Sequence, residues 1–578
     1  MTNIEIALVL KEVADFLKLK EDNPYRVRAY QKGAQIIERQ QEDIVRLVQE
    51  KRLDSIEGIG EKLASQIEEI IKTGRCSFLE ELKSEFPPIL KSILGIPGVG
   101  TKTARIIFNN LEIKSLSDLK KACESGEIRK LPSLGKKTEK KILQGIEKLE
   151  KQEQRHLLGL AFPFAKSLLN NIRDFDEVEF AELAGSIRRK QETVKDIDVV
   201  VITNNNHLQQ VKDKIIDLPL IRQILKDEGE KISFLNIIGL KVDVFLLSES
   251  KFPLRWIDLT GSKEHVEMLK EKAARKNHEL SLDGELNKES VSEEDVYSSL
   301  DLQYIPPELR EGEDEIKLAE DENIPDLIEK SQLKGDLHIH TNWSDGADSL
   351  EHMAYSAKNK GYEYIAITDH SRSLSIAGGL SIDELKNQVE NIRKLNEEQQ
   401  GSFKIFSGVE ADILNEGSLD YPDEILKELD FVVGSIHQGF GQDQEKITKR
   451  VLLAMENPYV RVIAHPLGRL INKREGHKLD LERIFEKAVE TGTALEINSS
   501  VDRLDLPFNY VKKAKEYGIK FVINTDAHDT NRLEEIKYGV FVARKGYLEQ
   551  DDVINTMSLY ELNLWLKEKK PGREQSEG

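Results

Sequence analysis

The stretch Gly185-Ser186-Ile187-Arg188-Arg189, followed by Lys195-Asp196-Ile197-Asp198-Val199-Val200-Val201, decides how the middle of this chain folds. A small Gly-Ser turn leads through two basic residues into an apolar run with the alternation of a strand. Residues two apart on a strand share a face, so Asp196 and Asp198 point the same way. A third acid, Asp243, lies in the alternating run 240–245, which suits a neighbouring strand. Because adjacent carboxylates repel each other unless a cation lies between them, the pattern predicts a divalent-metal site for phosphoryl or nucleotidyl transfer.

The alternative interpretation is that these acids simply face water on an edge strand. The combination of Gly-Ser-x-x-Arg, Asp-x-Asp and a later Asp, however, resembles the palm of family X DNA polymerases, part of the nucleotidyltransferase superfamily. The resemblance implies that Asp196, Asp198 and Asp243 are catalytic and hold Mg²⁺. It also implies that Ser186 and Arg189 bind the incoming triphosphate.

The nucleotide pocket of that family is followed less closely further along the chain. Thr260 and Gly261 match the family's Thr-Gly pair, which makes them predicted nucleotide-binding residues. Leu259 stands where many relatives carry an aromatic residue, Val266 where an Asn commonly contacts the nucleotide, and Lys270 where an Arg often touches the template. Losing one polar contact typically costs about 1–3 kcal/mol, so we expect catalysis with reduced affinity or fidelity. A degenerate polymerase half is the alternative.

The length of 578 residues predicts several domains. No apolar run is long enough to span a membrane, and no secretion signal is found at the N-terminus. Cys76 and Cys123 fit no zinc or disulfide pattern. We therefore expect a cytoplasmic protein with no membrane partner, and we expect it to be a monomer. The net charge of −20 is unevenly spread. Residues 1–150 carry 27 Lys and Arg against 24 Asp and Glu, and the basic surplus is greatest in 91–150, which is where we place DNA contacts.

Three similar Gly-containing turns recur in the N-terminal part, at 56–62, 94–102 and 131–137. Glycines of this kind allow tight turns and expose N–H groups at the start of the next helix to a phosphate. A single turn could join an ordinary helical hairpin, but three turns at spacings of about 36–38 residues favour sequence-independent binding of the DNA backbone by helix-hairpin-helix motifs. The predicted DNA-binding residues in these turns are Gly58, Gly60, Lys62, Gly98, Gly100, Lys102, Gly135 and Lys136.

The first 88 residues resemble the deoxyribose-phosphate lyase domain of the same polymerase family. In that family the Schiff-base lysine stands one helical turn after the position of Lys62, and here that position is Gln66, which cannot form an imine. We therefore expect weak or absent lyase activity. Arg26, Tyr30 and Lys62 are expected to hold a 5′-phosphate.

The C-terminal part holds eight of the chain's twelve His, and six of them end short apolar runs. Apolar strands alternating with helices predict a parallel sheet, most simply a barrel, whose strand C-termini converge on the active site. A single such His is usually an ordinary polar terminus, but six of them with Asp345, Glu410 and Asp526 indicate a metal centre. Mixed imidazole and carboxylate ligands suit Zn²⁺, Mn²⁺ or Fe²⁺ better than Mg²⁺ alone, and nine ligands suffice for two or three ions.

This arrangement resembles the PHP (polymerase and histidinol phosphatase) domain. The resemblance implies nine metal ligands, namely His338, His340, Asp345, His370, Glu410, His437, His465, Asp526 and His528. Arg372 and Lys473 are candidate phosphate contacts by their position near the rim.

We therefore expect a multidomain α/β and α+β protein with helical helix-hairpin-helix domains, a nucleotidyltransferase palm with a mixed β-sheet and thumb, and a distorted (β/α)7 PHP barrel. The expected boundaries are a lyase-like domain at 1–88, a fingers-type domain at 89–150, palm at 151–230, palm end and thumb at 231–318, an extended acidic linker at 319–334 and the PHP domain at 335–570.

The whole pattern resembles a bacterial family X polymerase fused to a PHP nuclease. It implies gap filling with dNTPs on gapped or nicked DNA in base excision repair, combined with a 3′-5′ exonuclease or 3′-end phosphodiesterase. Three alternatives stay open: a nuclease whose polymerase half only holds DNA, an inert metal-stabilised PHP scaffold, and a small-molecule phosphatase.

Overall fold

The computed structural model describes residues 3–568 except 21, 41–43, 54, 55, 57, 87, 88, 91, 92, 94, 95, 97, 98, 152–154, 205, 237, 238, 276–291, 399, 400 and 402. The chain divides into two compact units, Met1–Leu300 and Asp301–Gly578. Within these described residues, no helix has both the length and the apolar character that a membrane span requires.

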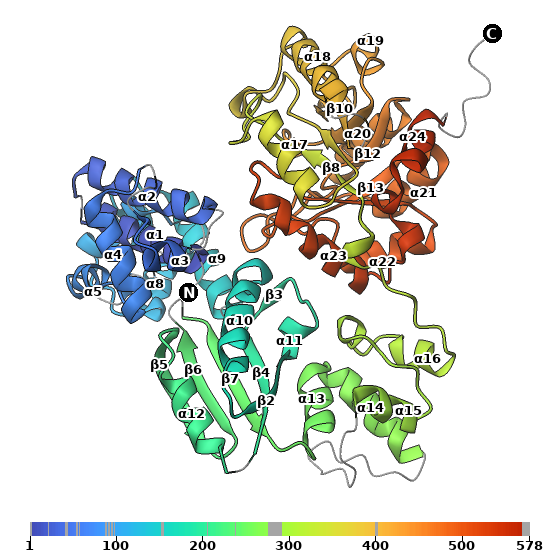
Figure 1. Cartoon of the computed structure of the whole chain (residues 1–578). Helices are drawn as coiled ribbons and strands as arrows, with labels where there is room; N and C mark the ends of the chain where they lie inside the picture. Colours follow the sequence, from blue (N-terminus) through green and yellow to red (C-terminus); the bar gives the residue numbers. More distant parts are fainter. Residues whose placement is uncertain are drawn as a thin grey trace. The chain divides into compact units, whose positions relative to one another are not determined.

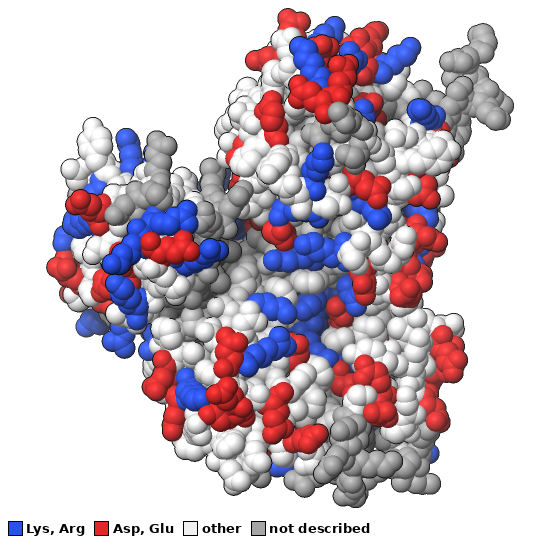
Figure 2. Space-filling model, in the orientation of Figure 1, with Lys and Arg blue, Asp and Glu red and all other residues white. Residues whose placement is uncertain are grey.

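The N-terminal part of the first unit is helical and is drawn in blue and cyan in Figure 1. Its helices are α1 Asn3–Leu19, α2 Pro24–Arg39, α3 Ile44–Gln49, α4 Glu61–Thr73, α5 Ser77–Ser84, α7 Thr101–Asn110, α8 Leu116–Glu124 and α9 Lys136–Lys151, with a 3₁₀ turn η2 at Ile128–Lys130. One continuous apolar core runs from Ile6 to Ile146 and joins them. Figure 2 shows that the visible face of these helices carries Lys and Arg interspersed with Asp and Glu, so the basic surplus does not form one uniform patch there.

The predicted mixed palm sheet is present. Its five strands lie in the order β2-β4-β7-β6-β5 and are β2 Val178–Ala184, β4 Asp196–Thr203, β5 Ile221–Glu228, β6 Lys231–Asn236 and β7 Lys241–Leu247. A short ladder pairs β1 (His156–Leu157) with β3 (Thr193–Val194), and the accompanying helices are α10 Leu158–Arg173, α11 Gly185–Arg188 and α12 Leu208–Ile216. Strands β4 and β7 run parallel, whereas the other pairs are antiparallel.

Three helices follow the palm sheet, α13 Phe252–Thr260, α14 Lys263–Arg275 and α15 Glu293–Ser299. A buried ion pair fixes them to the Gly-Ser turn, because Arg188 lies 2.6 Å from Glu293. The Arg188 guanidinium also stacks 3.4 Å from the centroid of the Trp256 ring. This contact anchors helix α13 to the turn that precedes strand β4.

The chain before the barrel combines helical turns with an extended stretch: residues 323–329 of the predicted linker 319–334 lie in no helix or strand, whereas the acidic residues ahead of the linker are folded and paired. It contains η3 Pro307–Leu309, α16 Glu315–Glu320 and η4 Lys330–Gln332, and it belongs to the second unit. The pairing is with cations of α23 (Ile536–Lys545): Arg544 lies 2.9 Å from Glu308, and the buried Lys545 lies 2.6 Å from Glu311. These partners are more than 230 residues apart in sequence, so local charge could not reveal them.

The second unit is the predicted parallel barrel, drawn from yellow to red in Figure 1 with helices around the strands. Its seven strands run in chain order: β8 Gly335–Ile339, β9 Tyr364–Ile367, β10 Lys404–Asp412, β11 Phe431–Ser435, β12 Val460–Ile463, β13 Ala494–Asn498 and β14 Phe521–Asn524. A parallel bridge between Ile339 and Ala527 nearly closes the ring between the first and last strands. The continuous apolar runs become strands buried on both faces, as a parallel sheet requires.

The helices of the barrel and its C-terminal cap are α17 Leu350–Asn359, α18 Ile382–Glu398, α19 Asp423–Leu426, α20 Gln444–Glu456, α21 Leu481–Thr491, α22 Phe508–Glu516, α23 Ile536–Lys545 and α24 Leu559–Lys567, with 3₁₀ turns η5 Ser375–Ala377, η6 Arg532–Glu535, η7 Gln550–Asp552 and η8 Ile554–Thr556. Cores on both sides of the strands hold the barrel together, one around Ile365 and one around Phe406.

Candidate active sites in the two units

The three palm aspartates come from the two parallel central strands. Asp196 and Asp198 lie on β4, and Asp243 on β7 is the register partner of Asp198. Burial first, and then the negative charges of Asp196 and Asp243, raise the pKa of Asp198 to about 7. Crowded carboxylates of this kind favour a bound divalent cation, which removes their mutual repulsion.

Asp243 is held by two lysines and keeps one oxygen free. Lys231 and Lys241 each donate a hydrogen bond of 2.8 Å to its Oδ2. Burial alone would raise the pKa of Asp243, but the two ammonium groups lower it below its ordinary value. Its buried Oδ1 has no hydrogen-bond partner in the described part of the chain, which fits a metal ligand.

Two features of the Gly-Ser turn require glycine at position 185: its backbone conformation and the closeness of Asp198. Gly185 has φ +64°, in the left-handed region, and a Cβ at this position would collide with Oδ2 of Asp198. Glycine alone satisfies both conditions. The turn can therefore approach the carboxylates closely.

The remaining nucleotide-binding candidates lie on the same side of the palm. Arg189 donates from Nη1 to the carbonyl of Thr260 at 2.6 Å, whereas the Thr260 hydroxyl accepts a hydrogen bond from Arg188. Gly261 ends α13 with its N–H bonded to Ile257. The structure thus joins Arg189 to the Thr-Gly pair. Ser186 lies in the short helix α11, directly after Gly185. Sequence reasoning missed Arg188, whose buried partner Glu293 is 105 residues away.

The raised pKa of Asp198 predicts a pH-dependent response to Mg²⁺. A carboxyl group whose folded-state pKa lies above 3.8 stabilises the fold while it is protonated, and this contribution is lost as the pH rises from about 4 to about 7. We expect Mg²⁺ to raise the thermal midpoint of the first unit by several degrees more at pH 8 than at pH 5, because at pH 5 it must displace a proton. Differential scanning calorimetry at both pH values measures this effect. In Asp198→Asn the Mg²⁺ increment should not change with pH, and an unchanged pH dependence in that variant would contradict the assignment.

The predicted 5′-phosphate residues gather around one ring that sequence reasoning missed. Arg26 and Lys62 lie 4.6 Å and 5.7 Å from the centroid of Phe78, and Tyr30 stacks on the same ring. The Tyr30 hydroxyl donates to Gln66 at 2.7 Å, so the side chain in the lysine position acts as an acceptor here. This geometry brings the predicted trio together.

The helix-hairpin-helix turns place glycines directly before helices. Gly60 caps α4, Gly100 caps α7, and Gly135 precedes α9, each with open space where a Cβ would lie. Gly58 adopts φ +91°. Lys62, Lys102 and Lys136 lie in the first turns of these helices, whereas Gly98 lies outside the described residues. The N-termini are therefore open to a ligand such as a phosphate.

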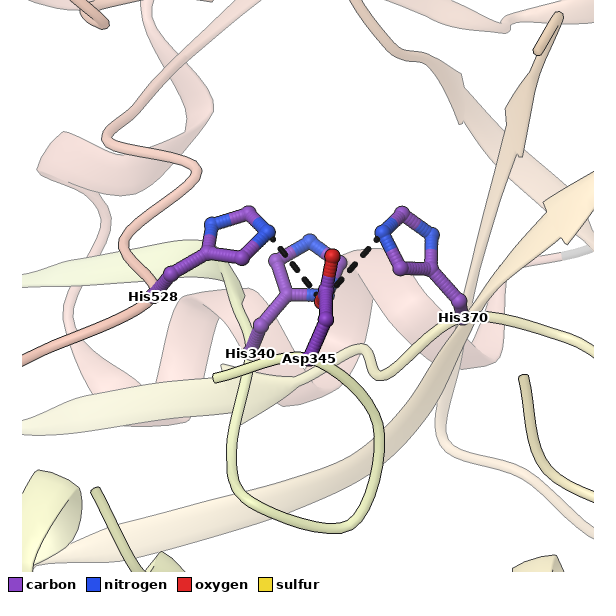
Figure 3. A group of neighbouring side chains, drawn as sticks. All are labelled: His340, Asp345, His370 and His528. Carbon is purple, nitrogen blue, oxygen red and sulfur yellow. Dashed lines mark ion pairs between the residues drawn. The ribbon is translucent and has the colours of Figure 1, made fainter. Parts of the chain in front are cut away.

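The nine predicted ligands of the second unit converge at the C-terminal ends of the barrel strands. In the first group, Asp345 Oδ1 lies 3.5 Å from His370 Nε2 and 3.2 Å from His528 Nε2, with His340 completing the set. Figure 3 shows His370 and His528 pointing at Asp345 from two sides, with His340 behind it. These four donors come from three separate loops.

Two further groups share members with the first one. His340 Nε2 lies 3.1 Å from Asp526 Oδ1, with His338 beside it. Glu410 is 2.7 Å from His370 Nδ1, 3.3 Å from His437 Nε2 and 2.9 Å from His465 Nε2. All nine residues thus form one continuous cluster, which contains three groups of donors that could each hold a metal ion.

The electrostatics of this cluster favour cations. Burial would raise the pKa of Glu410, but the imidazoles of His437, His370 and His338 hold it well below its ordinary value. Burial first, and then the positive charges of His528 and His370, lower the pKa of His340 to about 3, so this ring is neutral and can ligate a metal. The buried Nδ1 of His340 has no partner among the described residues.

Comparison with known proteins shows the family to which the chain belongs. Family models match a helix-hairpin-helix domain at residues 1–76, a SAM-like helix-hairpin-helix tandem at 90–148, a DNA polymerase beta thumb at 255–311 and a PHP domain at 336–500. The protein named DNA polymerase/3′-5′ exonuclease PolX of Bacillus subtilis (strain 168) is 38% identical over 571 residues, which cover 97% of this chain and 99% of that protein. The chain belongs to the PolX family.

The second unit of this PolX-family chain also has smaller relatives. A probable phosphatase of Thermoanaerobacter sp. (strain X514) is 35% identical over 249 residues, covering 41% of this chain and 95% of that protein. A probable phosphatase of Caldanaerobacter subterraneus subsp. tengcongensis is 34% identical over 256 residues, covering 42% of this chain and 94% of that protein. The PHP barrel therefore resembles proteins that lack the first unit.

Two buried acids of this PolX-family barrel, which sequence reasoning missed, lie beside predicted ligands. Glu496 lies 2.7 Å from His338 Nδ1 and accepts the backbone N–H of His465 at 2.7 Å. Asp369 directly precedes His370 and accepts hydrogen bonds from Thr341 and Gln388. Each carboxylate ends or interrupts an apolar strand run, and this was the available signal.

Glu496→Gln should lower the affinity of the PHP site of this PolX-family chain for Mn²⁺ by about 10–100-fold. The carboxylate fixes the orientation of the His338 ring and raises its basicity, and a neutral amide does neither equally well. Isothermal titration with Mn²⁺ measures the change. The control is Glu486→Gln on the exposed side of α21. Equal affinities for all three proteins would show that Glu496 does not position the ligand.

The two candidate phosphate contacts each have a partner outside the ligand cluster of this PolX-family barrel. Arg372 donates to the carbonyl of Asp420 at 2.6 Å, and the exposed Lys473 lies 3.5 Å from Asp502. Arg503, which sequence reasoning missed, instead lies 3.7 Å from Asp526. A cation therefore stands at the edge of the cluster, although not one of the two expected.

Proposed function

We propose that this PolX-family protein fills short gaps in DNA with dNTPs and trims 3′ ends with its PHP domain, in base excision repair. It is a DNA nucleotidyltransferase and a metal-dependent 3′-5′ exonuclease. The observation that carries the proposal is the presence of two separate cation-attracting clusters in one chain, one of three aspartates and one rich in imidazole. The helix-hairpin-helix turns supply binding to the DNA backbone.

In the polymerase half, Asp196, Asp198 and Asp243 hold Mg²⁺, and Ser186 and Arg189 bind the triphosphate with Thr260 and Gly261. Bound Mg²⁺ supplies positive charge to the phosphates as nucleotidyl transfer proceeds. Lys231 and Lys241 hold Asp243 by one oxygen and leave its Oδ1 for the ion. Gly185 lets the Gly-Ser turn lie against Asp198, which brings the triphosphate-binding residues beside the carboxylates.

In the nuclease half, the nine clustered residues hold two or three Mn²⁺ or Zn²⁺ ions. These ions supply Lewis acidity toward a phosphodiester. Glu496 orients His338, and Arg503 lies where it can contact a phosphate oxygen beside Asp526. The imidazole-rich donor set favours these metals over Mg²⁺.

We also propose the domain boundaries expected from the sequence, with the lyase-like part binding a 5′-phosphate through Arg26, Tyr30 and Lys62. These three side chains surround Phe78, which supports the proposal. Because Gln66 cannot form an imine and instead accepts a hydrogen bond from Tyr30, these residues bind the phosphate without lyase chemistry. The protein acts in the cytoplasm as a monomer.

The test is incubation of the protein with a one-nucleotide gap bearing a 5′-phosphate, with the primer labelled at its 5′ end. With dNTPs and Mg²⁺ the primer should grow by one nucleotide, and with Mn²⁺ alone it should shorten from its 3′ end. A protein that releases phosphate from histidinol phosphate but leaves the primer unchanged would instead be a small-molecule phosphatase.

One observation favours a second candidate, a PHP nuclease whose polymerase half only holds DNA. Val266 is buried and Leu259 packs against the Ala184 core, so neither offers a polar contact to a nucleotide. Under this alternative the gapped primer shortens but never grows at any dNTP concentration. Extension in the same assay excludes it.

A further inference from the structure

Three side chains from two barrel loops form a stack beside the PHP cluster. Phe440, in the loop after β11, lies nearly parallel to the ring of His477, with 5.0 Å between centroids and an interplanar angle of 13°. The Arg474 guanidinium lies 4.4 Å from the centroid of Phe440. Phe440 keeps 40% of its surface exposed, so part of its ring is open to a ligand.

The two loops begin at predicted metal ligands, so the stack lies next to the cluster. Phe440 follows His437 by three residues, and the rings of His437 and His465 are 5.4 Å apart. The backbone N–H of His477 bonds to the carbonyl of Leu467 at 2.6 Å, which returns the second loop to a position two residues after His465. Gln438 bonds to Asp412 and fixes the first loop. Both loops are therefore tied to the base of the site.

The chemistry of the stack suits a nucleotide. Burial first, and then the positive charges of His465 and Arg474, lower the pKa of His477 to about 4, so this ring is neutral. Arg474 donates only to an uncharged acceptor in the described part of the chain, the carbonyl of Gly468. Its pKa is lowered by burial and then by the charge of Arg503, and Asp502 opposes this effect.

Basic residues lie between the cluster and the stack. Arg503 lies 3.7 Å from Asp526, Arg474 is close enough to Arg503 for that charge to lower the pKa of Arg474, and the Arg474 guanidinium lies 4.4 Å from the centroid of Phe440. Aromatic rings and Arg guanidinium planes are the surfaces on which proteins stack unpaired bases, and cations beside them hold the adjoining phosphates.

We propose that the stack of Phe440, His477 and Arg474 is the binding platform for the base that adjoins the scissile phosphate of a single-stranded DNA 3′ end. The inference rests on the proposed nuclease function. We assign to this platform the preference of the nuclease for a 3′-terminal nucleotide that carries its base over an abasic 3′ terminus. A small phosphate ester without a base gains nothing from the stack.

The kinetic test compares two oligonucleotides that differ only in whether the 3′-terminal nucleotide carries its base. We expect kcat/KM of the unmodified protein to be about tenfold or more higher for the intact end, and this preference to fall toward one in Phe440→Ala and to persist in Phe440→Trp. Tyr355→Ala, which removes another exposed ring on α17, is the control and should keep the preference. An undiminished preference in Phe440→Ala would overturn the proposal.

A binding test separates this proposal from the nuclease function itself. In the His340→Ala background, a 2-aminopurine at the 3′ terminus should lose fluorescence on binding because it stacks, and Phe440→Ala should abolish this loss. If Phe440-dependent quenching were found but the unmodified protein did not cleave the strand, the platform would stand and the proposed nuclease function would be wrong. If the unmodified protein cleaved the strand but quenching did not depend on Phe440, only the platform would be wrong.

Discussion

His340→Ala should lower the rate of 3′-end degradation by about 10³-fold or more while primer extension continues. His340 belongs to two of the three ligand groups, so its loss disturbs the positions of at least two ions at once. A missing ligand costs several kcal/mol of transition-state stabilisation, and each 1.36 kcal/mol is a factor of ten in rate. The measurement is the rate of shortening of a 5′-labelled single strand in Mn²⁺.

The matched control for this variant is His352→Ala, because His352 is half exposed on α17 and pairs with Asp348. It should degrade the strand at the unmodified rate. If His340→Ala retained the unmodified rate, the PHP cluster would be an inert scaffold and the nuclease would lie elsewhere in the chain.

Asp198→Ala should lower dNTP incorporation at a one-nucleotide gap by about 10³-fold or more and leave the nuclease active. Asp198 neighbours both other aspartates, because it follows Asp196 by two residues on β4 and is the register partner of Asp243 on β7, and its carboxylate oxygen lies against Gly185. Without it the Mg²⁺ site loses a central ligand and the triphosphate loses the ion that neutralises it. Single-turnover primer extension in Mg²⁺ measures the loss.

Asp213→Ala, on an exposed turn of α12, is the control for the polymerase prediction. It should extend primers normally. Equal extension by Asp198→Ala would contradict the assignment of the palm carboxylates, whereas extension missing from the unmodified protein would favour the DNA-holding alternative.

The architecture and most of the two clusters could be predicted because their signals are local. The alternation around Asp196 and Asp198 predicted that both side chains lie on the same face of strand β4. The His residues at the ends of apolar runs indicated the edge of the barrel at which the predicted metal ligands gather. The role of Glu496 could not be predicted from the sequence, because a single acid inside an apolar run has no spacing that distinguishes it. Its partner His338 is 158 residues away.

The remaining misses have the same physical cause, which is pairing of charges far apart in sequence. Arg188 and Glu293 meet across 105 residues, and the acidic segment at 311 is neutralised by Lys545. Local composition predicts a solvated face in each case, and only the fold brings the opposite charge. Arg503 illustrates this too, since nothing near it in sequence points to Asp526.

The central claim is that the chain holds two distinct cation sites that serve opposite reactions on a DNA end. Anomalous diffraction from crystals soaked in Mn²⁺ tests it most directly. We expect anomalous density for Mn²⁺ between Asp196, Asp198 and Asp243, and two or three anomalous peaks among the nine residues around Glu410 and His340. Absence of density at either cluster in fully soaked crystals would contradict it.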